Sequence, residues 1–217
     1  MEFKEIGGIM LQYTEIKYNS EREWHNIRAS GIGGSDASVI FGKNPWKTSR
    51  KLWREKIGLE EAEDLSEKEA IIKGNMMEEP LLNILRARHP DWEIKKPDVT
   101  YKSYEYPYML ANLDGTADTG NEVIGIEIKT ATVRGLGIWK EDIPIYYYLQ
   151  ILHYMIVTGI RKFVLFAYIE NFENTLLKEY VIKYDHDDAQ ALIEKEKTFW
   201  KCVETKTQPE IEYTLEF

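Results

Sequence analysis

Three charged residues in the middle of the sequence have the types and spacing that phosphate chemistry requires. Glu127 and Lys129 lie two positions apart among isoleucines, and Asp114 stands in an Asp-Gly pair upstream. Side chains two apart share one face of a strand, so a neighbouring strand that ends at Asp114 would bring both carboxylates together. Mg²⁺ prefers such a site, with few protein oxygens and retained waters, and a nearby lysine stabilises developing negative charge. The set predicts phosphodiester hydrolysis with Mg²⁺, or with Mn²⁺ as its substitute.

The Glu-x-Lys spacing alone is a weak signal, because it occurs five times in the chain. The five pairs are Glu2/Lys4, Glu15/Lys17, Glu93/Lys95, Glu204/Lys206 and Glu127/Lys129. Only the last follows an Asp-Gly pair at a suitable distance and precedes a threonine, Thr130. The alternative for this pair is a cross-strand salt bridge on a solvated face.

A further carboxylate can come from residues 74–80, which read Gly-Asn-Met-Met-Glu-Glu-Pro inside a predicted helix. Glu78 and Glu79 are adjacent, so only one of them can face the core beside Met76 and Leu82. That glutamate would join the same acidic site. The alternative is that both are ordinary exposed glutamates, which is the usual place for this residue type.

Basic residues are concentrated in the segment 43–56, which holds six Lys or Arg and one acid. Its two tryptophans are Trp46 and Trp53. The chain carries a net charge of −9, but residues 1–58 sum to +3 and the remainder to −12. Cations beside an acidic metal site favour a groove that follows DNA phosphates, with Lys47 and Arg50 as candidate contacts. The alternative is a solvated amphipathic helix with Trp53 in the core.

The segment 30–35 reads Ser-Gly-Ile-Gly-Gly-Ser and is too rich in glycine for the interior of a helix. Ser35 is placed to cap the helix that follows, and such a junction exposes N–H groups that suit an anion. Arg28 and Ser35 flank this loop, and together they can hold a terminal phosphate. The alternatives are that Arg28 pairs with Glu21 or Glu23 and that Ser35 is only a cap.

Gln150 and His153 lie on one side of an apolar segment, residues 143–160, that contains no Asp, Glu, Lys or Arg. Its Pro, Gln, His and four Tyr favour a buried helix over a membrane span. We retain Gln150 as a residue that reaches the active site, whereas a lone buried His is more often a satisfied core residue. The four histidines show no metal spacing, and no phosphate-binding or dinucleotide fingerprint is present.

The chain of 217 residues has one cysteine, Cys202, which excludes an intrachain disulfide and a four-cysteine metal site. We expect a single domain over residues 1–217. Charged residues stand where a secretion signal would begin its apolar run, so we also expect a cytoplasmic protein.

Periodicity, capping residues and turn signals predict an α/β fold with a central mixed β-sheet flanked by helices. The predicted helices are residues 20–28, 35–41, 48–57, 66–89, 145–158 and 187–203, and the predicted strands are 108–113, 123–130, 163–170 and 175–183. Capping boxes at Ser20 and Ser66 begin the first and fourth helices. The buried side of the fourth helix is predicted to hold Ile71, Ile72, Met76, Leu81, Leu82 and Leu85.

These motifs together, in this order, resemble the YqaJ-type viral recombinase family. That family includes bacteriophage lambda exonuclease and belongs to the PD-(D/E)XK nuclease superfamily. The motifs are Trp24-His25 with Arg28, Gly33-Gly34-Ser35-Asp36-Ala37, Gly74-x-x-x-Glu78, Leu113-Asp114-Gly115, Glu127-x-Lys129 and Gln150. The resemblance covers residues of about 20–185, which leaves extensions at 1–19 and 203–217.

The resemblance implies a restriction-endonuclease-like core and a Mg²⁺-dependent exonuclease that degrades one strand of linear duplex DNA from its 5′ end. It implies that the metal is held by Asp114, Glu127, the carbonyl of Ile128 and Glu78. Lys129 would position or activate the water, and Gln150 would support the site. Arg28 and Ser35 would hold the 5′ phosphate. The resemblance also implies a ring-shaped homotrimer, a single-strand annealing partner for the 3′ overhang, and a phage or prophage origin in a bacterial host.

Three departures from the family pattern concern phosphate contacts or the choice of one acid. Glu79 rather than Glu78 precedes Pro80, Asn112 replaces a serine before the Asp-Gly pair, and Leu152 replaces a second glutamine. Asn112 is therefore a candidate DNA contact. Two other functions remain open at this point. One is an endonuclease of the same fold, and the other is an inert protein that binds DNA ends.

Overall fold

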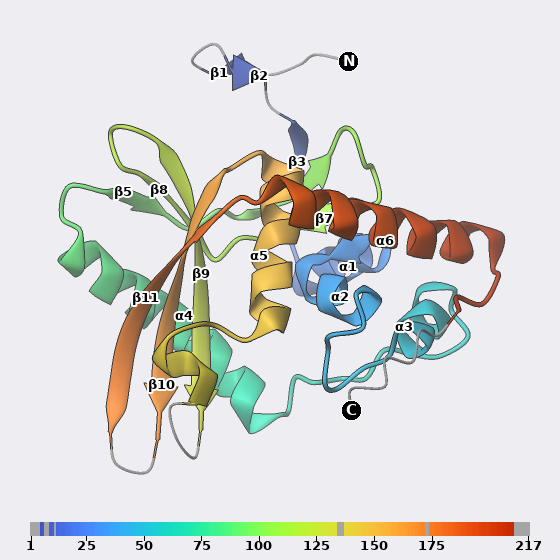
Figure 1. Ribbon diagram of the computed structural model, residues 1–217, viewed down its shortest axis with the longest axis horizontal. Coiled ribbons are helices and arrows are strands. Elements are labelled where there is room, and N and C mark those ends of the chain that lie inside the picture. The colour runs from blue at the N-terminus through green and yellow to red at the C-terminus, as the bar shows by residue number, and fades with distance from the viewer. Residues whose placement is uncertain (1–4, 7–8, 11, 134–136, 172–173, 211–217) are drawn as a thin grey trace.

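The computed structural model describes residues 5–6, 9–10, 12–133, 137–171 and 174–210 (Figure 1). Its helices are α1 (Glu21–Ala29), α2 (Gly34–Ile40), α3 (Ser49–Lys56), α4 (Glu69–Arg88), α5 (Ile145–Thr158), α6 (His186–Thr205) and the 3-10 helix η1 (Gly137–Lys140). Its strands are β1 (Glu5–Ile6), β2 (Ile9–Met10), β3 (Tyr13–Lys17), β4 (Ile32–Gly33), β5 (Glu93–Lys95), β6 (Val99–Ser103), β7 (Met109–Ala111), β8 (Gly115–Asp118), β9 (Val123–Thr132), β10 (Lys162–Glu170) and β11 (Thr175–Lys183). Parts of the two predicted extensions, residues 1–4, 7–8, 11 and 211–217, lie outside the residues that the structure describes.

The larger sheet has the strand order β11-β10-β9-β8-β5, and only the β9/β10 pair is parallel. Because side chains alternate along β9, Ile124, Ile126 and Ile128 pack on one face against Leu81, Leu82 and Leu85 of α4. The opposite face packs against α5, so the sheet lies between two helices (Figure 1). Glu127 and Lys129 therefore point toward the side of α5.

A second, four-stranded sheet has the order β3-β6-β7-β4 and was not predicted. Its strand β3 falls in the segment that the sequence placed outside the family resemblance, yet it pairs antiparallel with β6 along its whole length. Helix α5 contacts β6 and β7 of this sheet, as well as α2 and α6. This helix therefore joins the two sheets. Within the described residues no helix is long and apolar enough to cross a membrane.

The predicted strand over 108–113 is shorter and lies elsewhere than expected. Strand β7 covers Met109–Ala111 and belongs to the second sheet, whereas the neighbour of β9 is the unpredicted β8. The chain leaves one sheet at Ala111 and enters the other at Gly115. Asp114 thus lies on the crossover between the two sheets, directly before β8, and not at the end of a strand.

Two predictions about α4 were wrong. The helix begins after Lys68 without a side-chain cap, so the predicted capping box at Ser66 does not form. In the first two turns the residues that face the sheet are Lys73, which pairs with Glu170, and Gly74, which lies close to Thr130, and the apolar packing begins near Met77. For this reason Ile71, Ile72 and Met76 are 39%, 45% and 72% exposed, while Leu81, Leu82 and Leu85 are buried as predicted.

Candidate active site

Asp114 and Glu127 are brought together by the pairing of β8 with β9. Gly115 pairs with Ile126, and this register places Asp114 beside the backbone of β9. The Asp114 Oδ2 atom accepts a hydrogen bond of 2.8 Å from the N–H of Ile128. A Cβ atom at Gly115 would lie only 3.1–3.2 Å from Leu82 and Ile126, so glycine permits this close approach.

Glu127 is almost completely buried, with 1% of its surface exposed, and only one of its oxygens is satisfied. Its Oε1 accepts hydrogen bonds from Lys129 Nζ at 2.5 Å and from Gln150 Nε2 at 2.7 Å. Gln150 also donates to the hydroxyl of Tyr154 at 3.0 Å. The other oxygen of Glu127, Oε2, has no partner within the described part of the chain. A buried carboxylate oxygen without a partner is costly unless a cation approaches it.

The negative charges of Asp114 and Glu127 are only partly balanced by the one positive charge of Lys129. Burial, followed by the charge of Glu127, holds the pKa of Asp114 well above its usual range. Burial also raises the pKa of Glu127, although Lys129 opposes the shift. Burial alone would lower the pKa of Lys129, but the charges of Glu127 and Asp114 outweigh it and raise that pKa. One ammonium therefore serves two carboxylates.

The structure distinguishes Glu78 from Glu79. The charge of Glu78 raises the pKa of both Asp114 and Glu127, while its Oε2 accepts a hydrogen bond of 2.8 Å from Lys96. Glu79 instead pairs with Arg86 at 2.7 Å on the surface. Over the ranges that the structure describes, no three His, Cys, Asp or Glu side chains form a group that could hold a metal. The site thus offers two carboxylates, with Glu78 nearby and bound to a lysine.

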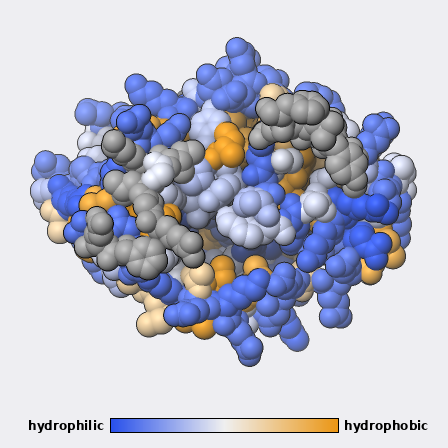
Figure 2. Space-filling view, turned by 60° about the horizontal axis from the view of Figure 1, so that its bottom comes forward, coloured by the Kyte–Doolittle hydropathy of each residue, from blue (hydrophilic) through white to orange (hydrophobic). Residues whose placement is uncertain are grey.

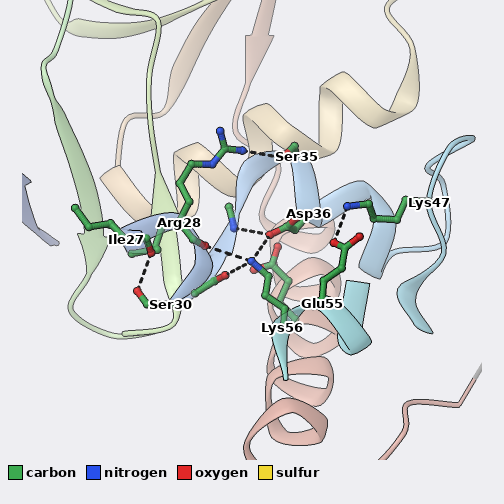
Figure 3. Close-up of polar contacts among 12 residues, drawn as sticks. Ile27, Arg28, Ser30, Ser35, Asp36, Lys47, Glu55 and Lys56 are labelled. Atoms are coloured by element: carbon green, nitrogen blue, oxygen red, sulfur yellow. Dashed lines mark hydrogen bonds and ion pairs between the residues drawn. The ribbon is translucent and has the colours of Figure 1, made fainter. Parts of the chain in front are cut away.

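Arg28 and Ser35 meet at the glycine loop, as the sequence predicted (Figure 3). The Arg28 Nη2 atom donates to Ser35 Oγ at 3.4 Å, and the guanidinium lies 4.5 Å from the ring centroid of Trp24. Arg28 forms no described ion pair with Glu21, which contacts His25, or with Glu23, which accepts from the N–H of Asn19. Its donor groups are therefore directed toward the start of α2.

Ser35 does not cap α2, contrary to prediction. The cap residue is Gly33, and Asp36 Oδ2 accepts a hydrogen bond of 3.1 Å from the N–H of Gly33. Because α2 begins at Gly34, Ser35 lies within its first turn, and its hydroxyl accepts the hydrogen bond from Arg28.

Lys56 of α3 is a residue that the sequence analysis did not single out, and it holds the loop in place (Figure 3). Its Nζ contacts Asp36 Oδ2 at 3.0 Å and donates to the carbonyls of Gly31 at 2.6 Å and Arg28 at 3.3 Å. Burial alone would raise the pKa of Asp36, but Lys56, the N–H of Gly33 and Arg28 lower it. The only signal in the sequence was membership of the basic segment 43–56, which names no single lysine.

Gly34 links the glycine loop to the acidic site. A Cβ atom at this position would lie 2.4 Å from a ring carbon of Tyr154 and 3.0 Å from Cγ of Gln150. No side chain fits in that space, so α2 and α5 pack directly at this point. The residues that face Arg28 and those that support Glu127 are thus in contact through Gly34.

The remaining candidates are placed less directly. Asn112 donates to Thr100 Oγ1 at 2.8 Å inside the second sheet, and Lys47 pairs with the buried Glu55 at 2.7 Å. Arg50 is exposed and has no ion pair with any described residue.

His153 is fully buried and was predicted to be a satisfied core residue, which the structure confirms. Its Nδ1 lies 2.8 Å from Glu196 Oε1, and its Nε2 lies 2.9 Å from the carbonyl of Leu110.

Known proteins match this chain in sequence and in fold. A sequence model of the YqaJ-like viral recombinase domain matches residues 23–161. The uncharacterized protein YqaJ of Bacillus subtilis (strain 168) is 33% identical over 184 residues, which cover 83% of this chain and 56% of that protein. The chain thus spans little more than half the length of this relative.

Two solved structures share the fold. The alkaline exonuclease LHK-Exo from Laribacter hongkongensis aligns with a TM-score of 0.70 and 15% identity, over 86% of this chain and 94% of that chain. A phage related exonuclease from Haemophilus somnus 129PT aligns with a TM-score of 0.57 and 14% identity, over 85% and 96%. These matches confirm the predicted α/β core. Because the sequence model covers more than half of the chain, including Asp114, Glu127 and Lys129, this protein belongs to the YqaJ-like viral recombinase domain family.

Proposed function

We propose that this protein is a Mg²⁺-dependent exonuclease that degrades one strand of linear duplex DNA from the 5′ end and leaves a 3′ overhang. The observation that carries the proposal is the unsatisfied Oε2 of the buried Glu127 beside Asp114. Family membership and the names of the two fold relatives, both called exonucleases, support the same class of reaction.

The residues fit a hard divalent cation. Asp114 and Glu127 offer carboxylate oxygens, and one lysine leaves their negative charge only partly neutralised. Mg²⁺ takes few protein ligands, so these two carboxylates with the carbonyl of Ile128 would hold it, and Glu78 would assist. When bound, such a cation acidifies water and neutralises charge that develops on phosphate, and Mn²⁺ would substitute for it.

Lys129 acts in this proposal as a fixed positive charge. Its raised pKa keeps the amine protonated at neutral pH, so it stabilises negative charge on the phosphate and orients water through its N–H donors. Gln150, in helix α5, holds Glu127 by a hydrogen bond. The two hydrogen bonds to Oε1 therefore fix the orientation of the Glu127 carboxylate, and Oε2 remains available to a cation.

Arg28 and Ser35 would recognise the 5′ phosphate, since a guanidinium and a hydroxyl at a loop before a helix suit a phosphate group. We expect a 5′-phosphorylated duplex to be digested roughly tenfold faster than a 5′-hydroxyl duplex, because charge-assisted hydrogen bonds are lost in the latter. The rates of digestion of the two duplexes check this expectation. Equal rates would remove the phosphate pocket from the proposal.

The family resemblance also supports a homotrimeric ring and a single-strand annealing protein as partner, in the cytoplasm of a bacterial host. A ring would bring cations from three copies around the duplex. Light scattering of the purified protein tests the trimer, which has three times the mass of one chain. A monomer at all concentrations would contradict it.

A strand-labelled digest tests the proposed activity. Linear duplex, covalently closed circular duplex and single-stranded DNA are incubated with Mg²⁺ or with chelator, and each strand carries its own label. We expect the 5′-ended strand of the linear duplex to shorten from its end, only with Mg²⁺. Equal cleavage of the closed circle would identify an endonuclease, and binding without cleavage would identify an inert DNA-end-binding protein.

A further inference from the structure

Three aromatic rings form a row from the surface to the candidate active site. Trp46 and Tyr146 pack edge to face with ring centroids 5.1 Å apart, and Tyr146 packs against Tyr147 at 4.6 Å. The Tyr147 ring in turn lies 5.0 Å from the ammonium of Lys129. We call Trp46, Tyr146 and Tyr147 the aromatic row. It connects the loop before α3 with the first turn of α5 and ends at Lys129.

The outer ring of the row is exposed although its backbone is held. Trp46 is 73% exposed. Asn44 Oδ1 accepts hydrogen bonds from the N–H groups of Trp46 at 2.9 Å and Lys47 at 3.0 Å, and Asn44 Nδ2 donates to Ser38 Oγ at 3.0 Å. The loop therefore presents the indole to solvent from a fixed support. Such preorganisation reduces the conformational entropy that the protein loses when a ligand binds.

The surroundings of the row combine exposed apolar surface with positive charge. Arg50, in the first turn of α3, is exposed and forms no ion pair with the described residues. Figure 2 brings forward the end of the molecule at which α5 begins, and it shows weakly polar and apolar side chains among hydrophilic ones there. The exposed ring of Trp46, with the exposed cation of Arg50 four positions later in the chain, suits a ligand that has both an aromatic ring and a phosphate.

We infer that the aromatic row is a base-stacking surface for an unpaired nucleotide of the DNA strand that enters the site. The inference rests on the proposed function. It adds a contact with a DNA base to the proposed contacts with DNA phosphates. Every base has an aromatic face, so stacking on Trp46 does not depend on DNA sequence. At the inner end, Tyr147 and Lys129 would place the phosphate that follows the stacked base near Asp114 and Glu127.

The size of the row favours a nucleotide over a second protein molecule. A stable protein interface buries at least about 1,000 Å² in total, whereas only one ring of this row is largely exposed. Tyr146 and Tyr147 are half-buried. A single base can cover such a surface, and a second copy of the chain would need much more of it.

A thermodynamic cycle between the protein and the DNA tests the inference. The affinity of a duplex with a short unpaired 5′ tail is measured by fluorescence anisotropy in chelator, so that no strand is cut. The same duplex is prepared with an abasic tail. We expect Trp46→Ala to weaken binding of the intact tail roughly tenfold and to leave binding of the abasic tail nearly unchanged.

Two control variants accompany this measurement. Trp46→Phe retains a ring and should recover most of the affinity. Val181→Ala, at a 57% exposed site on the edge strand β11, should leave the affinity for both DNAs unchanged. Equal losses with the intact and abasic tails would overturn the inference while leaving the proposed function in place. A wild-type protein that binds neither DNA would overturn both. Self-association that disappears in Trp46→Ala would identify the row as a contact between copies and would also overturn the inference.

Discussion

The same Glu-x-Lys pattern occurs on two strands of the larger sheet, in two different surroundings. On β5, Lys95 contacts Glu93 at 2.7 Å, and both side chains are about two-thirds exposed. On β9, Lys129 contacts Glu127 at 2.5 Å, but these side chains are 18% and 1% exposed. Each pair has another carboxylate beside it, but Asp118 beside the first pair is exposed, whereas burial raises the pKa of Asp114 beside the second.

The difference shows that the position of a Glu-x-Lys pair in the sheet determines whether its charges are solvated or buried. An exposed pair is solvated and contributes little to stability, because water screens both charges. The inner pair is desolvated, shares one lysine between two carboxylates, and leaves an oxygen of Glu127 without a partner. Burial and charge imbalance, rather than the spacing of the two residues, therefore distinguish the site.

The largest expected effect is on catalysis. Lys129→Ala should lower the rate of DNA degradation by about a thousandfold, because a preorganised charge at the phosphate is lost, while DNA binding persists. Lys95→Ala has the same spacing to its glutamate and should retain wild-type activity. Rates of nucleotide release and binding affinities of both variants check this. Unchanged Mg²⁺-dependent degradation by Lys129→Ala would remove the lysine from the mechanism.

A smaller effect concerns stabilisation by metal. If Mg²⁺ binds the folded protein alone, a concentration one hundred times its dissociation constant stabilises the fold by about 2.7 kcal/mol. Glu127→Gln should abolish this gain, and Glu93→Gln should keep it. Thermal unfolding with and without Mg²⁺ measures both. Equal stabilisation of the two variants would place the metal elsewhere.

A third effect is on the stability of the metal-free protein. Asp114→Asn should stabilise the fold by about 1 kcal/mol, because it removes one of two partly neutralised charges and its amide oxygen still accepts from the N–H of Ile128. Denaturant titration in chelator measures the change. Asp118→Asn, at the exposed end of the same strand, is the matched control and should have little effect. Destabilisation by Asp114→Asn would show that the two carboxylates are not in conflict.

The smallest effect is on the dependence of stability on pH. The pKa values of Asp114 and Glu127 are raised, so the folded state holds protons that the unfolded state has already released above about pH 4. The free energy of unfolding should therefore fall as pH rises from there through the folded pKa values. Asp114→Asn should flatten this slope. The lowered pKa of Asp36 acts oppositely, since its contribution is lost as pH falls, and Asp36→Asn should therefore not flatten the decline at higher pH.

Much of the larger sheet and its helices could be predicted, because their sequences carry strong periodicity. The alternation in β9 correctly assigned Glu127 and Lys129 to one face, and the long strands β10 and β11 were also predicted. The second sheet could not be predicted in the same way. Its strands are two to five residues long, and pairing with distant segments determines them more than local pattern does.

The sequence predicted those parts of the candidate site that depend on the chemical type of a residue. It did not predict the contacts that depend on which partner the fold brings to a residue. Arg28 and Ser35 meet as expected, but nothing local showed that Asp36 would accept from the N–H of the cap residue Gly33 or that Lys56 would hold the loop. Lys47 looked like a DNA contact because of its charge. Its pairing with Glu55, buried by tertiary packing, was not visible in the sequence.

The most direct test of the account compares wild type with Asp114→Asn on one substrate. Release of nucleotides from a 5′-phosphorylated linear duplex is measured in Mg²⁺, at protein concentrations that saturate the DNA for both proteins. We expect the 5′-ended strand to be degraded by the wild type and no detectable loss of it with the folded, DNA-bound variant. Equal release by the two proteins would contradict the assignment of Asp114 and Glu127 as the catalytic centre.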